Sequence, residues 1–346
     1  MLEPRRLARR CCSCFARQWR AVWRHRRVST KRGSQIGIAL SIIICTHNRP
    51  KDLKSCLAAL TPQLRDSVEV IIIDSASEPP ATAQPLAEHP HIRLHRLTKP
   101  GLSLARNVAV SLSKGPWLAF LDDDAVPDSG WMDEILALIE RLPPRTGAAG
   151  LYTYPLWPPG VDTNLPELWN EHLSFVELDG EMDLTNAPVF VGANMLLHRQ
   201  AVIEAGGFPE HLSRQGQLLI SGEDVYMVEK LRRAGWSIWY SSRPRAGHHI
   251  PRDRLESAWF RKRMFWQGVT YLRQRVYLDA ATPVLLAARS VAAAPILMGL
   301  SLLDSQRGTR LARAMWHLGI VRALFMRQAL RPPGSAFEGG MNSSTR

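Results

Sequence analysis

Three consecutive carboxylates follow an apolar run in the middle of the sequence. Asp122, Asp123 and Asp124 come directly after residues 118–121, which are Leu-Ala-Phe-Leu. Ionised carboxylates about 4 Å apart repel one another by roughly 4 kcal/mol near a protein surface unless a cation or solvent lies beside them. Because side chains alternate along an extended segment, we expect Asp122 and Asp124 on one side and Asp123 on the other. Two carboxylates at a strand end predict a site for Mg²⁺ or Mn²⁺, and a solvated acidic turn is the alternative.

Two further polar clusters stand at the ends of apolar runs. Residues 36–46 are apolar and β-branched and end in the polar cluster 46–49, and residues 68–73 lead into the polar cluster 74–77. Short apolar runs of this kind predict buried strands. Since ligands of an open α/β sheet bind at the carboxyl ends of its strands, we expect all three polar clusters to face one ligand there.

Apolar runs alternate with helical spacing along the chain, which predicts an α/β fold with a doubly wound sheet. The first half predicts strands at 36–46, 68–73, 92–97 and 117–121, and helices around Leu53 to Leu60, at 81–90 and at 101–113. The second half predicts strands at 189–198 and 236–240, and helices at 199–205, from the N-cap Ser221 to Gly235, and at 256–277. Residues 150–190 are rich in turn signals and are expected to form a surface excursion over the substrate site.

The charge of the chain is unevenly distributed, although its net value is +13. Residues 1–33 carry eleven basic residues and one acid, a net of +10. Residues 34–242 carry 16 basic and 25 acidic residues, a net of −9, and residues 243–331 carry 16 basic and 4 acidic residues, a net of +12. Basic flanks indicate a polyanion nearby: an anionic membrane face, nucleic acid or a phosphorylated substrate.

Residues 1–35 are expected to form a basic arm. The arm is either flexible or an interfacial helix that lays Trp19 and Trp23 on anionic lipid. No uninterrupted apolar segment follows its basic residues, so no signal peptide is predicted.

The five cysteines do not make a disulfide framework, which favours a reducing compartment. Three of them lie at positions 11, 12 and 14, and Cys11 and Cys14 form a CxxC without a second pair. That spacing alone is a weak signal for zinc binding or redox chemistry.

Residues 256–331 predict a basic helical extension, and residues 332–346 a disordered tail. Within the extension, residues 283–303 form a stretch of 21 mostly apolar residues that could just span a bilayer. Arg289 and Pro295 inside this stretch favour a core or interfacial helix instead.

Taken in order, the polar clusters resemble the family 2 glycosyltransferases of the GT-A fold. The stretches that carry the resemblance are SIIICTHNRP at 41–50, IIIDSAS at 71–77, GLSLARN at 101–107, FLDDD at 120–124, GAN at 192–194, GGF at 206–208, GED at 222–224 with Arg232 to Gly235, and His248 before Ile250 and Pro251. The resemblance covers about residues 38–255. It implies a GT-A domain at 36–255, with a mixed sheet, a nucleotide-binding N-terminal half and an acceptor-binding C-terminal half.

The resemblance also implies residue roles. Members of the family move a sugar from a nucleoside diphosphate donor to a hydroxyl, and a divalent cation, Mg²⁺ or Mn²⁺, takes the charge that develops on the leaving diphosphate. The implied metal ligands are Asp122, Asp124 and His248. The implied nucleotide-binding residues are Thr46, Arg49, Asp74, Arg106, Asp122 and Asp123, with Asp74 pairing with the base, typically uracil.

The acceptor side of the site follows from the same resemblance. Gly192, Asn194 and Glu223 are implied to bind the acceptor or the donor sugar. Asp224 is implied to be the general base, since an inverting transfer needs a carboxylate that takes the proton of the acceptor hydroxyl. The chain departs from the family at 74–77, which is Asp-Ser-Ala-Ser where Asp-Asp or Asp-Asn before Gly-Ser is common, and at His47, where an aromatic residue is common.

The sequence therefore predicts an inverting, metal-dependent glycosyltransferase that uses a UDP-sugar and a glycan or lipid-linked acceptor in cell-surface polysaccharide or glycolipid synthesis. It is expected in the cytoplasm, peripheral on an anionic membrane face and without a specific nucleic acid partner; the excess of Arg over Lys is typical of a GC-rich bacterial genome. A nucleotidyl- or phosphate-transferring enzyme would need a Gly-rich loop after the first strand, and residues 46–50 contain no glycine. A basic nucleic-acid- or membrane-binding protein on an inactive scaffold would explain the charge but not the acidic clusters.

Overall fold

The structure, a computed structural model, describes residues 37–81, 90–170, 172–187, 192–213, 218–278, 283–301 and 307–326. The predicted basic arm with its three cysteines, most of the helix predicted at 81–90 and the predicted tail lie outside the described residues. The sections below concern the described part of the chain.

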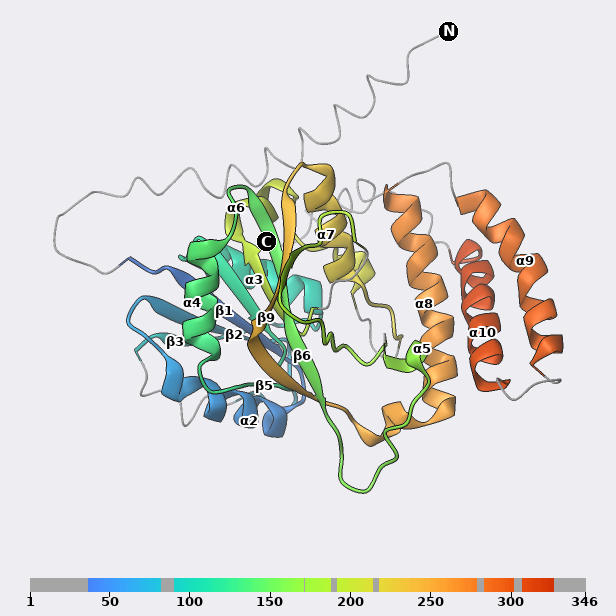
Figure 1. Ribbon diagram of the computed structural model, residues 1–346, viewed down its shortest axis with the longest axis horizontal. Coiled ribbons are helices and arrows are strands. Elements are labelled where there is room, and N and C mark those ends of the chain that lie inside the picture. Colours follow the sequence, from blue (N-terminus) through green and yellow to red (C-terminus); the bar gives the residue numbers. More distant parts are fainter. Residues whose placement is uncertain are drawn as a thin grey trace, which may run out of the picture.

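One mixed sheet of nine strands forms the centre of the described molecule (Figure 1). The strands are β1 (Leu40–Thr46), β2 (Val68–Asp74), β3 (Ile92–Arg96), β4 (Trp117–Leu121), β5 (Ala125–Pro127), β6 (Thr146–Leu156), β7 (Glu181–Asp183), β8 (Asn194–His198) and β9 (Ser237–His249). Their order is β3-β2-β1-β4-β8-β6-β9-β5, with β7 beside β9. The first four strands are parallel, and β8 runs antiparallel to both β4 and β6. The predicted α/β fold with a mixed sheet is confirmed.

Helices cover both faces of the sheet. One face packs against α3 (Leu102–Leu112), α6 (Arg199–Glu204) and α7 (Glu223–Arg233), and the other against α2 (Pro50–Leu60) and α4 (Trp131–Arg141). Along β1, Ile43 faces the first core and Ile42 and Ile44 face the second. Burial on both faces is the reason that the parallel strands are continuous apolar runs in the sequence.

The predicted surface excursion at 150–190 is wrong at its start. Residues 146–156 form β6, a central strand whose first six residues are buried. Pro155 lies near the end of β6, beyond the residues that pair with β8, where a strand tolerates a residue without an N–H group. Farther along, the excursion contains only the short helix α5 (Glu167–Asn170) and the short strand β7 as described elements.

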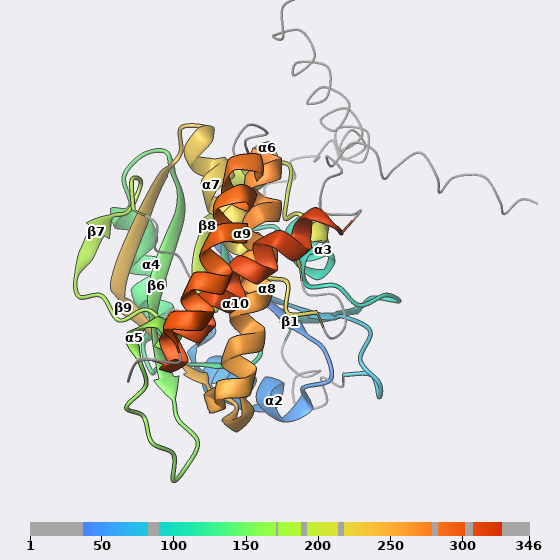
Figure 2. The same cartoon turned by 90° about the vertical axis from the view of Figure 1, so that its right-hand side faces the viewer.

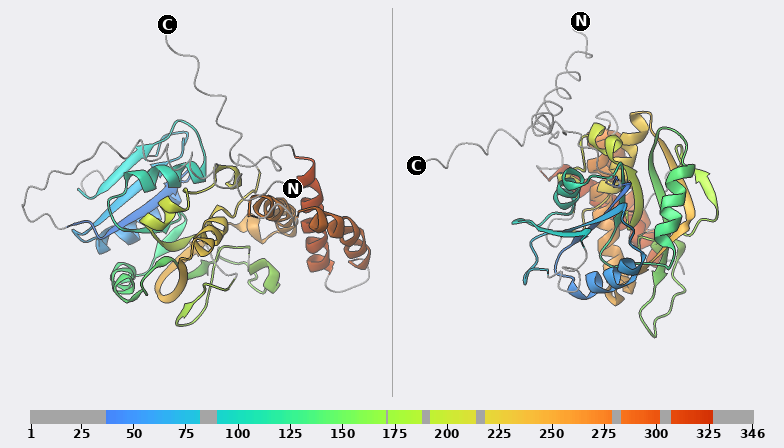
Figure 3. Two further views of the ribbon diagram at one scale, coloured as in Figure 1. Left: turned by 90° about the horizontal axis from the view of Figure 1, so that it is seen from above. Right: turned by 90° about the vertical axis from the view of Figure 1, so that its left-hand side faces the viewer.

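Three long helices follow the sheet: α8 (Ser257–Leu278), α9 (Pro283–Leu300) and α10 (Arg307–Leu324). They stand to one side of the sheet, with α8 nearest and α9 outermost (Figures 1 and 3). Helices α8 and α10 approach closely at two glycines, where there is no room for a side chain. A Cβ at Gly268 would lie 1.9 Å from Trp316 O, and one at Gly319 would lie 1.9 Å from Phe265 O. Among the helices that the structure describes, none has the length and apolar character needed to cross a membrane.

Candidate active site

The carboxyl ends of β1, β2 and β4 meet at one edge of the sheet, as the sequence predicts. Thr46 and Asp74 are neighbours at the last paired position of β1 and β2. The Thr46 hydroxyl donates a hydrogen bond of 2.7 Å to Asp123 Oδ2, which joins the end of β1 to the loop after β4. The three polar clusters therefore form one site.

The three aspartates form a turn instead of continuing β4. The Ala125 N–H donates a hydrogen bond of 3.0 Å to Asp122 O, which bends the chain. The predicted alternation is therefore wrong, because it assumed an extended segment. In the turn, Asp123 and Asp124 share one cationic partner and Asp122 has another.

Arg49, from the loop after β1, is the partner of Asp123 and Asp124. Its Nη1 lies 3.0 Å from Asp123 Oδ1 and 2.7 Å from Asp124 Oδ2. Both carboxylates are almost fully buried, whereas 32% of the Arg49 side chain is exposed. A guanidinium thus supplies the positive charge that adjacent carboxylates require.

Asp124 and His248, two of the three predicted metal ligands, lie together. His248 is buried in β9 opposite Ala125, and its Nε2 lies 3.3 Å from Asp124 Oδ1. That oxygen is buried and accepts no hydrogen bond of good geometry from the described residues, and carboxylate oxygens are ligands that Mg²⁺ and Mn²⁺ prefer. The predicted third ligand, Asp122, lies apart, and no three His, Cys, Asp or Glu side chains of the described segments are grouped so as to hold a metal ion.

Burial and charge set the protonation of the acidic turn. Burial raises the pKa of Asp123 to about 7, although Arg49 opposes the shift. Burial also disfavours the charge of Asp124, but the contact with His248 and the charge of Arg49 outweigh it and hold the pKa of Asp124 well below its usual range. Asp124 is therefore charged at neutral pH, where Asp123 changes its charge.

Arg106, on α3, connects the acidic turn to α7. Its guanidinium is 3% exposed, and Nη1 donates a hydrogen bond of 2.8 Å to Glu223 Oε1 while Nη2 lies 3.4 Å from Asp122 Oδ1. The same group packs over the rings of Phe120 and Phe208, at 5.8 and 5.4 Å from their centroids. A buried cation thus joins a carboxylate of each half of the chain.

Glu223 and Asp224 begin α7 and have different surroundings. Burial raises the pKa of Glu223 to about 7, with Arg106 opposing the shift and Asp224 adding to it. The Asp224 side chain is partly exposed, and its Oδ1 accepts a hydrogen bond of 2.8 Å from the Val225 N–H. A Cβ at Gly192 would lie 2.5 Å from Asp224 Oδ2, so this glycine leaves room for the carboxylate.

Helix α8 holds the loop that leads into α7. Gln274 Nε2 donates a hydrogen bond of 2.8 Å to Gly222 O, and Arg263 Nη1 donates one of 2.7 Å to Ser221 Oγ. The N-cap predicted at Ser221 is wrong, since Gly222 is the N-cap, with a φ of 93° that favours glycine, and no side chain caps the helix. The sequence did not predict this role for Arg263 and Gln274, because the pattern of residues 256–277 indicated only a basic helix.

The predicted sugar-binding role of Asn194 does not fit its position. Asn194 is fully buried: its Oδ1 accepts a hydrogen bond of 3.1 Å from Trp131 Nε1, and its Nδ2 donates to Tyr152 O and Pro244 O at 3.0 and 3.2 Å. The amide therefore joins α4 to β6 and β9 inside the core. The local sequence around Asn194 does not reveal that its side chain turns inward, because its partners are distant in sequence.

Asp74 is engaged within its own loop. Its side chain is 1% exposed, and Oδ1 and Oδ2 accept hydrogen bonds of 2.9 and 3.1 Å from the N–H groups of Ser77 and Ala81. Burial would raise its pKa, but these hydrogen bonds and the charge of Arg96 hold the pKa below its usual value. The carboxylate acts here as a cap of the turn, and pairing with a nucleobase stays a prediction.

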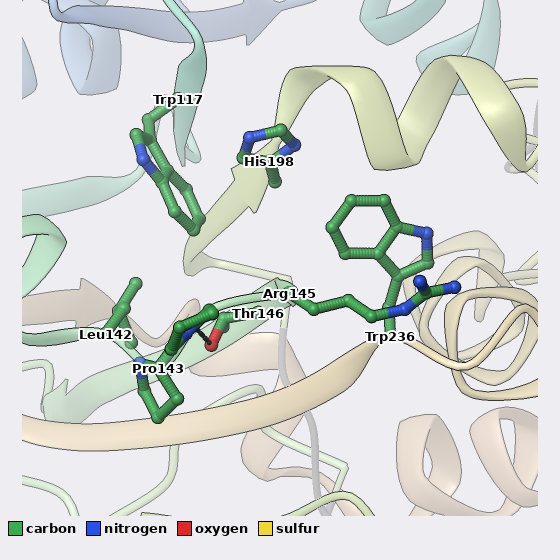
Figure 4. Close-up of a pocket in the computed structure, with 8 residues that line it drawn as sticks. Trp117, Leu142, Pro143, Arg145, Thr146, His198 and Trp236 are labelled. Carbon is green, nitrogen blue, oxygen red and sulfur yellow. Dashed lines mark hydrogen bonds between the residues drawn. The ribbon is translucent and has the colours of Figure 1, made fainter.

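A pocket of about 490 Å³ lies at the other edge of the sheet, away from these residues (Figure 4). Trp117, the first residue of β4, pairs there with His198, the last residue of β8. Arg145 and Trp236 come from the loops before β6 and β9. The indole of Trp236 stacks on His198 at a centroid distance of 5.4 Å. None of the predicted site residues lines this pocket.

Comparison with known proteins agrees with the fold. The succinoglycan biosynthesis protein ExoM of Rhizobium meliloti is 28% identical over 308 residues, which cover 82% of this chain and 92% of that protein. The glucosyl-dolichyl phosphate glucuronosyltransferase of Haloferax volcanii is 21% identical over 235 residues, covering 66% of this chain and 75% of that protein.

A solved structure has a similar fold. It is that of the mannosyltransferase PcManGT from Pyrobaculum calidifontis in complex with GDP-Man and Mn²⁺, which is 19% identical and matches 92% of this chain and 95% of its own with a TM-score of 0.53. Residues 41–206 match the sequence model of the family described as "Glycosyl transferase family 2". These residues contain the ends of β1, β2 and β4 and the acidic turn, and they are the part of the chain that matches glycosyl transferase family 2.

Proposed function

We propose that this protein is an inverting, metal-dependent glycosyltransferase that moves a sugar from a nucleoside diphosphate donor to a hydroxyl of a glycan or lipid-linked acceptor. The observation that carries the proposal is the link made by Arg106, which contacts Asp122 on the predicted donor side and Glu223 on the predicted acceptor side. A transferase must bring two substrates to one point, and this buried contact joins the two predicted half-sites.

The donor is a nucleoside diphosphate sugar whose base is left open. The expectation of uridine depended on Asp74, and both oxygens of that buried carboxylate already accept hydrogen bonds from its own loop. The similar solved structure of PcManGT holds GDP-Man and Mn²⁺, which supports a diphosphate donor and a divalent cation without choosing the base for this chain. Arg49 is a partly exposed cation of the site, in contact with the acidic turn, and is assigned to the diphosphate.

Asp124 and His248 are the residues assigned to the metal, and Asp122 would join them by leaving Arg106. When bound, Mg²⁺ or Mn²⁺ would neutralise charge on the departing diphosphate. Asp124 fits this role because it stays charged at neutral pH and one of its oxygens has no hydrogen bond of good geometry.

Asp224 is assigned as the general base. It stands in the first turn of α7, its carboxylate is partly exposed, and Gly192 leaves space beside it. The carboxylate would take the proton of the acceptor hydroxyl as that oxygen attacks the sugar. Glu223, which is buried against Arg106, would hold the arginine and the start of α7 in position.

The acceptor is proposed to belong to polysaccharide or glycolipid synthesis. A relative named for succinoglycan biosynthesis and one named for transfer to a dolichyl phosphate glucoside support a glycan or lipid-linked acceptor. The basic C-terminal part of the chain agrees with work at an anionic membrane face.

The test is release of nucleoside diphosphate from UDP-, GDP- and TDP-sugars by the full chain with Mn²⁺, alone and with glycan acceptors. We expect turnover of one donor class, and we expect Asp224→Asn to lower kcat by about 10²- to 10⁴-fold while nucleotide binding persists. Asp179→Asn, at an exposed position outside the site, is the matched control. A folded protein that uses none of the donors, or an Asp224→Asn variant with full activity, would contradict the proposal.

A further inference from the structure

The outward side of α9 carries most of the exposed large hydrophobic side chains that the structure describes. Of the eight large hydrophobic side chains that are exposed in the described residues, five lie on this helix. They are Leu285, Val291, Ile296, Met298 and Leu300, with 71, 58, 61, 44 and 42% of their surface exposed. Monomeric soluble proteins rarely leave a contiguous apolar surface of this kind without a partner.

Four exposed apolar residues form a stripe along the helix, with the exposed Arg289 beside it. Leu285, Ala288, Ala292 and Ile296 follow one another at spacings of three or four residues and are all exposed, so they share a face. The opposite side of α9 packs inward, where Ser290 Oγ lies 3.0 Å from His317 Nδ1 of α10. The apolar stripe is therefore turned away from the rest of the molecule.

The surroundings of the stripe are strongly basic. Helices α8, α9 and α10 contain ten Lys and Arg residues and no Asp or Glu. Arg289 is exposed on α9 itself, and Arg310 Nη1 lies 3.4 Å from Leu300 O, at the end of α9. An apolar stripe among basic residues complements a surface whose interior is apolar and whose outer layer is anionic: the stripe can enter the interior while the basic residues contact the outer layer.

Charge also argues against the other occupants. A second copy would bring the same basic helices together, and residues 1–33 carry a net charge of +10, so both would be repelled. Ala288, Ala292 and Gly299 make the face smooth, without a deep anchoring point for a protein side chain. A lipid surface needs no such anchoring point.

We propose that α9 docks this protein on an anionic membrane, lying in the plane of the headgroups with its apolar stripe turned towards the acyl chains. Figure 2 views the molecule from the side of α9 and α10, which stand clear in front of α8 and the sheet. An apolar helix face with basic residues beside it binds in this position through buried apolar area and through attraction to anionic lipid. The helix lies on the membrane and does not cross it.

The docked helix is connected to the active site through its neighbours α10 and α8. Helix α10 packs against both α9 and α8, and α8 bonds through Gln274 and Arg263 to the loop that starts α7. Docking therefore fixes Asp224 at a set position relative to the bilayer. In this respect the inference rests on the proposed function, since it brings the general base to the surface where a lipid-linked acceptor would be held.

The test is co-sedimentation of the full chain with phosphatidylcholine vesicles that contain or lack phosphatidylglycerol. The variant is Leu285→Glu with Ile296→Glu, and the control is Ser55→Glu with Ala58→Glu, which adds the same charge at exposed positions of α2. We expect the wild type and the control to bind phosphatidylglycerol vesicles, and the α9 variant to bind at least about tenfold more weakly, since burying one large aliphatic side chain contributes about that factor. Circular dichroism of both variants checks folding.

Three outcomes would overturn the inference: the α9 variant binds vesicles as the wild type does, the two kinds of vesicle bind equally, or the wild type is a dimer that the α9 variant converts to a monomer. The last outcome would identify the face as an interface between copies. Mn²⁺-dependent nucleotide binding without vesicles is measured on the same samples and should be equal in the variant and the wild type. Loss of vesicle binding with intact nucleotide binding supports docking by α9, whereas absent nucleotide binding with intact docking would contradict only the proposed function.

Discussion

Two arginines divide the acidic side chains of the site into two sets. Arg49 neutralises Asp123 and Asp124, and Arg106 neutralises Asp122 and Glu223. Adjacent carboxylates in the sequence predict a cation beside them. Here the cations are two guanidinium groups, one from the loop after β1 and one from α3. A bound metal ion and diphosphate would compete for the same contacts, so substrate binding is expected to rearrange Arg49 first, because it is the more exposed of the two.

Gly192 is predicted to be indispensable because of the space that it leaves. In Gly192→Ala, the new Cβ would meet Asp224 Oδ2 at 2.5 Å and displace the proposed general base. A displacement of about 1 Å can reduce turnover by about 10²-fold, so we expect a fall in kcat of that order with little change in melting temperature. Gly37→Ala, where a Cβ meets nothing within 4 Å, should leave kcat unchanged. Equal kcat in the two variants would contradict the assignment.

In the metal-free protein, the stabilisation that Glu223 and Asp123 contribute through their raised pKa values is predicted to be lost as pH rises from about 5 to 8. Burial raises the pKa values of Glu223 and Asp123 to about 7, above the unfolded values of 4.5 and 3.8. At these two carboxyls the folded state therefore binds more protons than the unfolded state in this window, and the stabilisation present at low pH is lost as pH passes 7. The lowered pKa of Asp124 acts in the opposite direction below pH 4. Burial also lowers the pKa values of His172 and His211 from 6.5 to about 4, and these histidines act in the opposite direction up to about pH 6.5.

Thermal unfolding in a chelator, measured across this pH range, checks that prediction. Glu223→Gln keeps a neutral group beside Arg106, so the melting temperature of the variant relative to the wild type should rise from pH 5 to 8. An equal dependence of the melting temperature on pH in the wild type and in Glu223→Gln would contradict the assigned ionisation states.

At the scale of elements, the contact between α8 and α10 is predicted to control the stability of the helical part. Gly268→Ala would bring a Cβ to 1.9 Å from Trp316 O, a backbone atom that cannot move aside without shifting α10. Overpacking of this kind costs about 1–3 kcal/mol, so calorimetry should show a lower melting temperature.

Gly299→Ala on α9 is the matched control for this substitution. A Cβ there meets nothing within 4 Å, and alanine favours a helix by up to about 1 kcal/mol over glycine. We therefore expect an unchanged or higher melting temperature. A loss of stability equal to that of Gly268→Ala would mean that helix propensity, and not the close approach of α8 and α10, sets the effect.

The elements that the sequence predicts well are those buried on two faces. β1, β2 and β4 are continuous apolar runs, and they were expected within a few residues of their observed bounds. β6 was missed because its second half contains Pro155 and ends near further turn signals, although its first half is buried in the sheet. α4 was not predicted, yet Trp131, Ile135 and Leu138 bury one face of it at helical spacing.

The site was predictable in its residue types but not in its pairings. Residues 122–124 and 222–224 stand where the resemblance expects them, at a strand end and a helix start. The pairings depend on contacts distant in sequence, such as Arg106 with Glu223, which no local pattern contains. For the same reason the inward turn of Asn194 became visible only once Trp131 and Tyr152 were packed against it.

At the scale of the molecule, the active edge of the sheet and the basic helices are parts of one arrangement. The N-terminal strands supply the proposed donor site, and α7 supplies the proposed base. Helix α8 hydrogen-bonds to the loop that starts α7, and it packs against the outer helices on its other side. An enzyme with a lipid-linked acceptor needs its base held at a fixed height above the membrane, and a helical unit packed on α7 can provide this.

The measurement that tests the central claim most directly is calorimetric titration of the full chain with UDP, GDP, TDP and CMP, with Mn²⁺ and with a chelator. We predict that one nucleoside diphosphate binds only with Mn²⁺. Asp124→Asn, shown to be folded by circular dichroism, should weaken this binding by at least about tenfold, and Asp179→Asn should not. A folded wild type that binds no nucleotide, or that binds one equally well in chelator, would contradict the account.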